Sequence, residues 1–130
     1  MNKRMPYFAI VAITLTAFLG IVRTGHTARK PAAEIKIVSD DIGGVVTSSK
    51  GPEAGVWVIA ETKDLPTGFR KIVVTDDQGR YVIPQLPKAT YDVWVRGYGL
   101  VDSPKVKAMP GKMLDLTAVI APDSHTAAQY

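Results

Sequence analysis

The fold is decided by the stretch VTDDQGRYVIPQLP at residues 74–87 and by YDVWV at residues 91–95. Aspartate and glycine within residues 76–79 favour a tight turn, because Asp accepts hydrogen bonds from nearby backbone amides and Gly reaches positive φ. The β-branched and aromatic residues on either side alternate with polar ones, which predicts strands. The stretch therefore indicates strand, turn, strand, loop and strand, and it points to a small β-sandwich without catalytic apparatus.

The same pattern of short strands and turns continues in both directions from this stretch. Residues 56–62 alternate, so that Val56, Val58 and Ala60 are expected to face one side of a sheet. The adjacent glycines in residues 42–47 suggest a bulge or a close approach of the backbone. Six to seven short strands, with no amphipathic helix after residue 22, predict an all-β sandwich. Strands are expected within residues 35–38, 42–47, 56–62, 69–75, 80–83, 90–98 and 112–120.

The N-terminus has the pattern of an export signal. Lys3 and Arg4 form a positive region, and the apolar stretch PYFAIVAITLTAFLGIV at residues 6–22 carries no charge. Residues 1–22 are therefore expected to be a signal peptide or a signal-anchor helix. Cleavage stays open, because Ala28 suits the end of a signal whereas His26 does not suit the position two residues earlier. In both cases the protein is expected in the periplasm or at the cell surface, with membrane contact only through residues 6–22.

The composition defines the remaining segments and excludes several partners. Residues 23–33 are polar and aperiodic and are expected to be a linker, residues 34–121 the folded domain, and residues 122–130 a flexible tail. The net charge of +4 is partly N-terminal, and basic and acidic residues alternate in the domain. A nucleic-acid partner is therefore not expected. The absence of cysteine excludes disulfides and thiolate metal sites, so the core alone must stabilise the fold.

Five pieces of this sequence, taken together, resemble the carboxypeptidase regulatory-like domain family. They are GGVVT at 43–47, GPEAGV at 51–56, TDDQGRY at 75–81, LP at 86–87 and YDV at 91–93. The resemblance covers roughly residues 42–121. It implies a transthyretin-like β-sandwich with a carbohydrate-binding-like fold and no peptidase site of its own. It also implies that the module is accessory to a larger exported protein.

Catalytic, cofactor and metal sites are not expected in this chain. The two histidines, His26 and His125, lie outside the expected sandwich, so a rigid triad or histidine metal site has no scaffold. The acidic pairs at 40–41 and 76–77 could bind calcium through carboxylate oxygens. Turn formation is the favoured alternative, because no further acidic residue follows at ligand spacing.

The candidate binding surface consists of Trp57, Trp94, Arg96 and Tyr98. Trp94, Arg96 and Tyr98 fall on one face of the strand at 90–98. Exposed aromatic rings flanked by charge can hold a protein partner or a sugar ring. The structural alternative is that the face is covered, or that Arg96 stacks on Trp94 as a cation–π pair. The leading hypothesis is a non-catalytic interaction or support module, and the alternative is a carbohydrate-binding module with a cell-envelope glycan as ligand.

Overall fold

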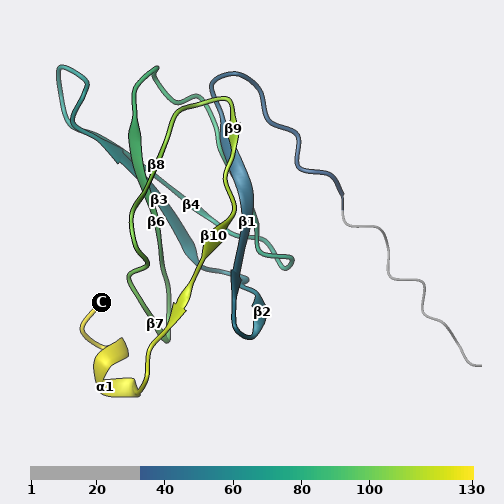
Figure 1. Ribbon diagram of the computed structural model, residues 1–130, viewed down its shortest axis with the longest axis vertical. Coiled ribbons are helices and arrows are strands. Elements are labelled where there is room, and N and C mark those ends of the chain that lie inside the picture. The colour runs from purple at the N-terminus through teal and green to yellow at the C-terminus, as the bar shows by residue number, and fades with distance from the viewer. Residues whose placement is uncertain (1–32) are drawn as a thin grey trace, which may run out of the picture. The chain divides into compact units, whose positions relative to one another are not determined.

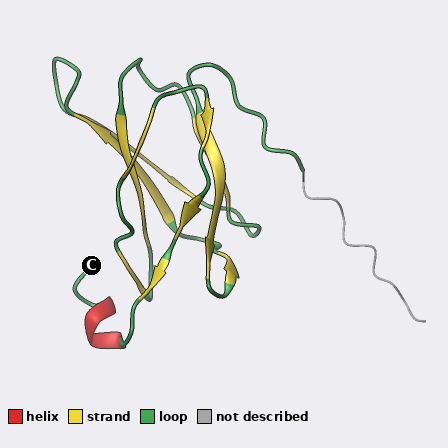
Figure 2. Ribbon diagram, in the orientation of Figure 1, coloured by secondary structure: helices red, strands yellow, loops and turns green. Residues whose placement is uncertain are grey.

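The computed structural model describes residues 33–130. The expected signal or anchor and most of the linker lie outside the described residues. Among residues 33–130, no helix has the length and apolar character that crossing a membrane requires. The described residues form three sheets, with one short helix near the C-terminal end (Figures 1 and 2). Two larger sheets enclose the core, and β7 (Leu100–Val101) pairs antiparallel with β11 (Val119–Ile120) in a small third sheet.

The first sheet is built around β1 (Ile42–Ser48). One edge of β1 pairs antiparallel with β5 (Arg80–Ile83) and with β2 (Gly51–Pro52). Two parallel strands, β9 (Lys112–Met113) and β10 (Leu116–Thr117), also pair with β1 and keep one continuous register along it. Two strands from the C-terminal part of the chain thus pair with the first strand of the domain.

The second sheet is antiparallel throughout, with the order β4-β3-β6-β8. β3 (Trp57–Thr62) lies between β4 (Phe69–Val74) and β6 (Tyr91–Arg96), and β8 (Val106–Ala108) forms the edge beyond β6. The alternation expected along residues 56–62 is confirmed, because Val56, Val58 and Ala60 are buried in the core.

The core fills the space between the two sheets. Its fully buried side chains come from β1, β5, β3 and β6, and burying each of the larger ones stabilises the fold by about 1.5–3 kcal/mol. Phe69 meets the Tyr91 ring edge-on, with 6.2 Å between ring centroids. The largest fully buried side chains are Tyr91, Ile42, Ile83, Val46, Val58, Val93 and Val95.

The first sheet needs a glycine at position 44, as the sequence suggested. A Cβ on Gly44 would lie 2.0 Å from the carbonyl oxygen of Leu114. Tyr81, the partner of Gly44 in β5, donates its hydroxyl to that same oxygen at 2.6 Å. Burial, and to a smaller extent the charge of Asp115, raises the pKa of Tyr81 above its usual range. The phenol therefore stays protonated and acts as a donor that joins β5 to the segment between β9 and β10.

Residues 35–38 differ from the expected strand. They carry no ladder bonds and instead lie over the first sheet, where Ile35 and Ile37 approach the position that a Cβ of Gly43 would occupy. Arg80 donates to the carbonyl of Ala33 at 2.7 Å, which holds this segment close to β5. Ile35 and Ile37 thus pack without a strand partner, whereas Val38 is exposed.

The chain makes the expected tight turn at residues 76–79. Asp76 accepts hydrogen bonds from the amides of Gln78 and Arg80, both at 2.9 Å, and Gly79 has φ +73°. The predicted turn is therefore confirmed, although it carries the chain from one sheet to the other. Residues 33–130 contain eleven strands where six to seven were expected, because the expected strand at 112–120 is split into β9, β10 and β11, and β2, β7 and β8 lie outside the expected strands. The expected tail at 122–130 contains α1 (Ser124–Ala127).

Candidate interaction surface

The outward face of the second sheet carries Trp57, Trp94 and Arg96 of the candidate binding surface, and Tyr98 lies just beyond it. In the ladder between β3 and β6, Trp57 pairs with Arg96, Ile59 with Trp94, and Glu61 with Asp92. Trp57 is half exposed at 49%, and Tyr98, beyond the end of β6, is fully exposed. Trp94 is only 6% exposed. The structure therefore separates the buried Trp94 from the exposed Trp57 and Tyr98.

Trp94 is covered by a lysine from the segment before β8. Lys105 places its ammonium 4.1 Å from the centroid of the Trp94 ring, in cation–π geometry. The alternative of a cation–π pair between Arg96 and Trp94 is therefore wrong, because the cation over the ring is Lys105. Lys105 comes from a segment whose pairing with β6 could not be inferred from the sequence. Trp94 consequently supports the sheet and does not belong to the exposed surface.

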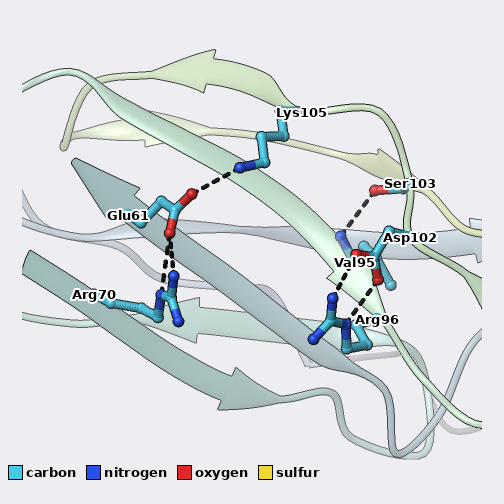
Figure 3. Close-up of polar contacts among 7 residues, drawn as sticks. All are labelled: Glu61, Arg70, Val95, Arg96, Asp102, Ser103 and Lys105. Carbon is cyan, nitrogen blue, oxygen red and sulfur yellow. Dashed lines mark hydrogen bonds and ion pairs between the residues drawn. The ribbon is translucent and has the colours of Figure 1, made fainter. Parts of the chain in front are cut away.

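Arg96 forms a bidentate ion pair with Asp102. Its Nε donates to Oδ1 at 2.7 Å and its terminal nitrogen to Oδ2 at 2.5 Å (Figure 3). These bonds hold the pKa of Asp102 below its usual range and raise that of Arg96. Next in the chain, Ser103 accepts from the amide of Val95 at 2.8 Å and returns a backbone bond to its carbonyl. The segment from residue 97 to residue 102, which contains β7, is thereby tied to β6 at its far end.

Glu61 lies between two cations on the same face. Lys105 donates to one carboxylate oxygen at 2.7 Å, and Arg70 to the other at 2.6 Å (Figure 3). Hydrogen bonds from Lys105 and then Arg70 lower the pKa of Glu61. Asp92 and Lys107 form a further pair at 2.9 Å beside them. Glu61 and Asp92 on this part of the face are thus both paired with cations of the same domain.

Beyond these ion pairs, the end of the sandwich has an open depression of about 870 Å³, which we call the end groove. Trp57 and Arg96 of the second sheet and Tyr98 of the loop line it, together with Ile120 and Tyr130 from the C-terminal segment. The amide of Ala121 donates to the carbonyl of Gly99 at 3.0 Å and fastens that segment to the loop. Three of the four sequence-predicted residues thus meet at the end groove.

The C-terminal wall of the end groove was not expected from the sequence. The residues there read as a polar tail, although Asp123 is a recognisable N-cap whose side chain accepts from the amide of Thr126 at 2.7 Å. This cap holds α1 beside the loop that carries Tyr98. A capping aspartate before an alanine-rich stretch was therefore the available signal for a structured end.

The acidic pairs take part in turns. Asp41 accepts from the amides of Val38 at 3.1 Å and Gln85 at 3.3 Å, and Asp76 closes the turn that begins β5. Within residues 33–130, no three side chains of His, Cys, Asp or Glu gather as a metal site would require. The end groove offers aromatic rings and a paired guanidinium, which suits reversible binding.

Comparison with known proteins defines the fold. No protein-family model and no curated protein matches the chain in sequence. An ancillary pilin of streptococci is similar in structure, with a TM-score of 0.51 and 14% identity, over 68% of this chain. This chain spans 31% of the pilin. A proposed carbohydrate-binding protein of Pseudomonas aeruginosa matches with a TM-score of 0.41 and 16% identity, over 66% of this chain and 92% of that protein. The pilin similarity supports a β-sandwich fold.

Proposed function

We propose that this chain is an exported, non-catalytic module of the carboxypeptidase regulatory-like type that binds a protein partner and supports a larger exported protein. The uncharged stretch at residues 6–22 behind Lys3 and Arg4 supports export. The β-sandwich fold and the positions of GGVVT in β1 and TDDQGRY at the inter-sheet turn support the family. The fold shared with an ancillary pilin is compatible with a structural role.

The end groove is the observation that carries the proposed binding. Aromatic rings concentrate at the centres of protein interfaces, because they bury a large area and lose few rotamers. Here the exposed rings of Trp57, Tyr98 and Tyr130 line one depression. Arg96 is already paired with Asp102, so a partner can cover it without leaving an isolated charge.

Cross-linking in intact cells tests this proposal. A lysine-reactive reagent would be applied to cells that produce the full chain, and the adducts of the chain would be compared between variants. We expect a discrete adduct that is lost when Trp57→Ser and Tyr98→Ser are combined. Met113→Ser is the control, because Met113 lies on the first sheet and is about as exposed as Trp57. Identical adducts in both variants would argue against the end groove as the binding site.

Carbohydrate binding is the second candidate, favoured by the two exposed rings of Trp57 and Tyr98 at one groove. Sugar rings stack on aromatic faces of this kind, so a ligand would change the emission of Trp57. Because Trp94 is buried under Lys105, Trp57 would give most of the signal. Titration of the full chain with cell-envelope oligosaccharides should then quench fluorescence, and Trp57→Phe should abolish the response. An unchanged spectrum with all of these glycans would exclude this candidate.

A further inference from the structure

The second sheet has an open edge at β4. All six residues of β4 pair with β3, and within the described residues β4 pairs with no other strand. The amide of Thr75 donates to Val56 at 3.0 Å where this ladder begins. Because bonded and non-bonded pairs alternate in an antiparallel ladder, the backbone groups of Arg70, Ile72 and Val74 point away from β3. These three residues leave hydrogen-bonding groups available along the edge.

The side chains on this edge leave it accessible. Natural edge strands are commonly guarded by charged residues, especially lysine. In β4, however, Arg70 binds Glu61 on its own sheet, and Lys71 donates to the carbonyl of Pro84 at 2.5 Å. Ile72 and Val74 are 47% and 57% exposed on the outward face. Both cations thus have partners within the domain, although the Arg70 side chain stays 62% exposed beside Ile72 and Val74.

We propose that β4 pairs antiparallel with β4 of a second copy of this chain, which joins the two four-stranded sheets into one. In the joined sheet, each residue of one copy must lie opposite a residue of the other copy whose side chain is on the same face. Two registers near the middle of β4, centred on Lys71 or on Ile72, satisfy this condition. One sets Lys71 opposite Lys71 of the other copy, which is unfavourable because like charges then face each other. The other sets Ile72 opposite Ile72, and Arg70 opposite Val74. The strand is therefore self-complementary in the Ile72 register.

This register also continues the apolar surface from one copy to the other. Trp57 pairs with Val74 in the β3–β4 ladder, and Ile59 with Ile72, so each copy brings an apolar row to the shared edge. Pairing would cover Ile72 and Val74 of both copies and satisfy the open backbone groups. The end groove contributes Trp57 to this row, but the proposed pairing does not depend on what the groove binds.

Single cysteines test the pairing directly, because the chain has none of its own. In the Ile72 register the two residues 72 have Cα atoms about 5.5 Å apart, within disulfide range. The two residues 70 are offset by four positions, roughly 13 Å, which is too far. Full-length Ile72→Cys and Arg70→Cys chains in mild detergent would be oxidised and compared on a non-reducing gel. We expect at least tenfold more covalent dimer with Ile72→Cys.

Two further results decide the register and the pairing. Combining Arg70→Cys with Val74→Cys should restore cross-linking, because these positions face each other between copies. Equal yields from Ile72→Cys and Arg70→Cys would indicate random collision and overturn the proposal. Absence of dimer from Ile72→Cys, in a chain whose circular dichroism matches the parent, would overturn it as well.

Discussion

Gly79 is the residue on which the turn between the two sheets depends. Its φ is +73°, and a Cβ there would lie 2.6 Å from the carbonyl oxygen of Val46. Gly79→Val would add a β-branched side chain to a strained conformation and push it into β1. We expect the free energy of unfolding to fall by about 3 kcal/mol, measured by urea denaturation.

Gly99 provides the matched control for this prediction. It has the same φ of +73°, but nothing lies within 4 Å of the position of its Cβ. Gly99→Val should therefore cost only the backbone strain, about 1–2 kcal/mol. Equal losses at positions 79 and 99 would show that contact with β1 does not matter at the turn.

The ion pair of Asp102 with Arg96 makes the stability of the folded protein depend on pH. Its hydrogen bonds to Arg96 lower its pKa in the folded protein below the unfolded value. A depressed carboxyl pKa contributes stability that is present above the unfolded pKa, about 4, and is lost as the pH falls through the folded pKa. Asp102→Asn should therefore be less stable than the parent at pH 7, and the difference should shrink below about pH 4. Thermal melts across pH 2–7 would check this, and a constant difference would contradict it.

At the scale of the elements, the segment before β8 matters because it covers Trp94. Removing the Lys105 side chain should expose the indole and release Glu61 from one of its cations. In a Trp57→Phe background, Lys105→Ala should shift Trp94 emission to longer wavelength and increase quenching by acrylamide.

Lys107→Ala is the control for that shift. Lys107 lies on the same face and pairs with Asp92, but the ring of Trp94 is contacted by Lys105. We therefore expect Lys107→Ala to leave the emission maximum unchanged. An equal shift in both variants would mean that loss of positive charge, and not loss of cover, changes the spectrum.

The strands with regular alternation could be predicted from the sequence. In β3 and β6 the inward series is read correctly because alternation along a single strand shows which side chains share a face, whichever strand it pairs with. The parallel pairing of β1 with β9 and β10 joins residues 70 positions apart, and no local pattern specifies it. Residues 35–38 have strand composition, but they carry no ladder bonds, and Ile35 and Ile37 instead pack over Gly43 of the first sheet.

The candidate surface was predicted in part for the same reason. Local alternation places Trp57 and Arg96 on the outward face of the sheet. Alternation does not reveal whether that face is covered, and the cover over Trp94 comes from Lys105 beyond a loop. The wall containing Ile120 and Tyr130 likewise reaches the end groove only through the tertiary fold.

At the scale of the whole molecule, the sandwich separates its possible contacts. The end groove lies where the segment after β6 meets the C-terminal segment, whereas β4 is the open edge strand of the second sheet. A partner at the groove and a second copy at the edge would use different backbone groups. Ile72→Cys cross-linking should therefore persist in the Trp57→Ser, Tyr98→Ser chain, and its loss would show that the two sites are coupled.

Site-specific photo-cross-linking measures partner binding at the end groove most directly. A photoreactive phenylalanine analogue would replace Tyr98 in the full chain in living cells, and a second chain would carry it at Met113. Both positions are exposed, but only position 98 lines the end groove. We expect a discrete protein adduct at position 98, at least tenfold above that at position 113, and Trp57→Ser should reduce it. Equal labelling at both positions would contradict the end groove as the binding surface of this module.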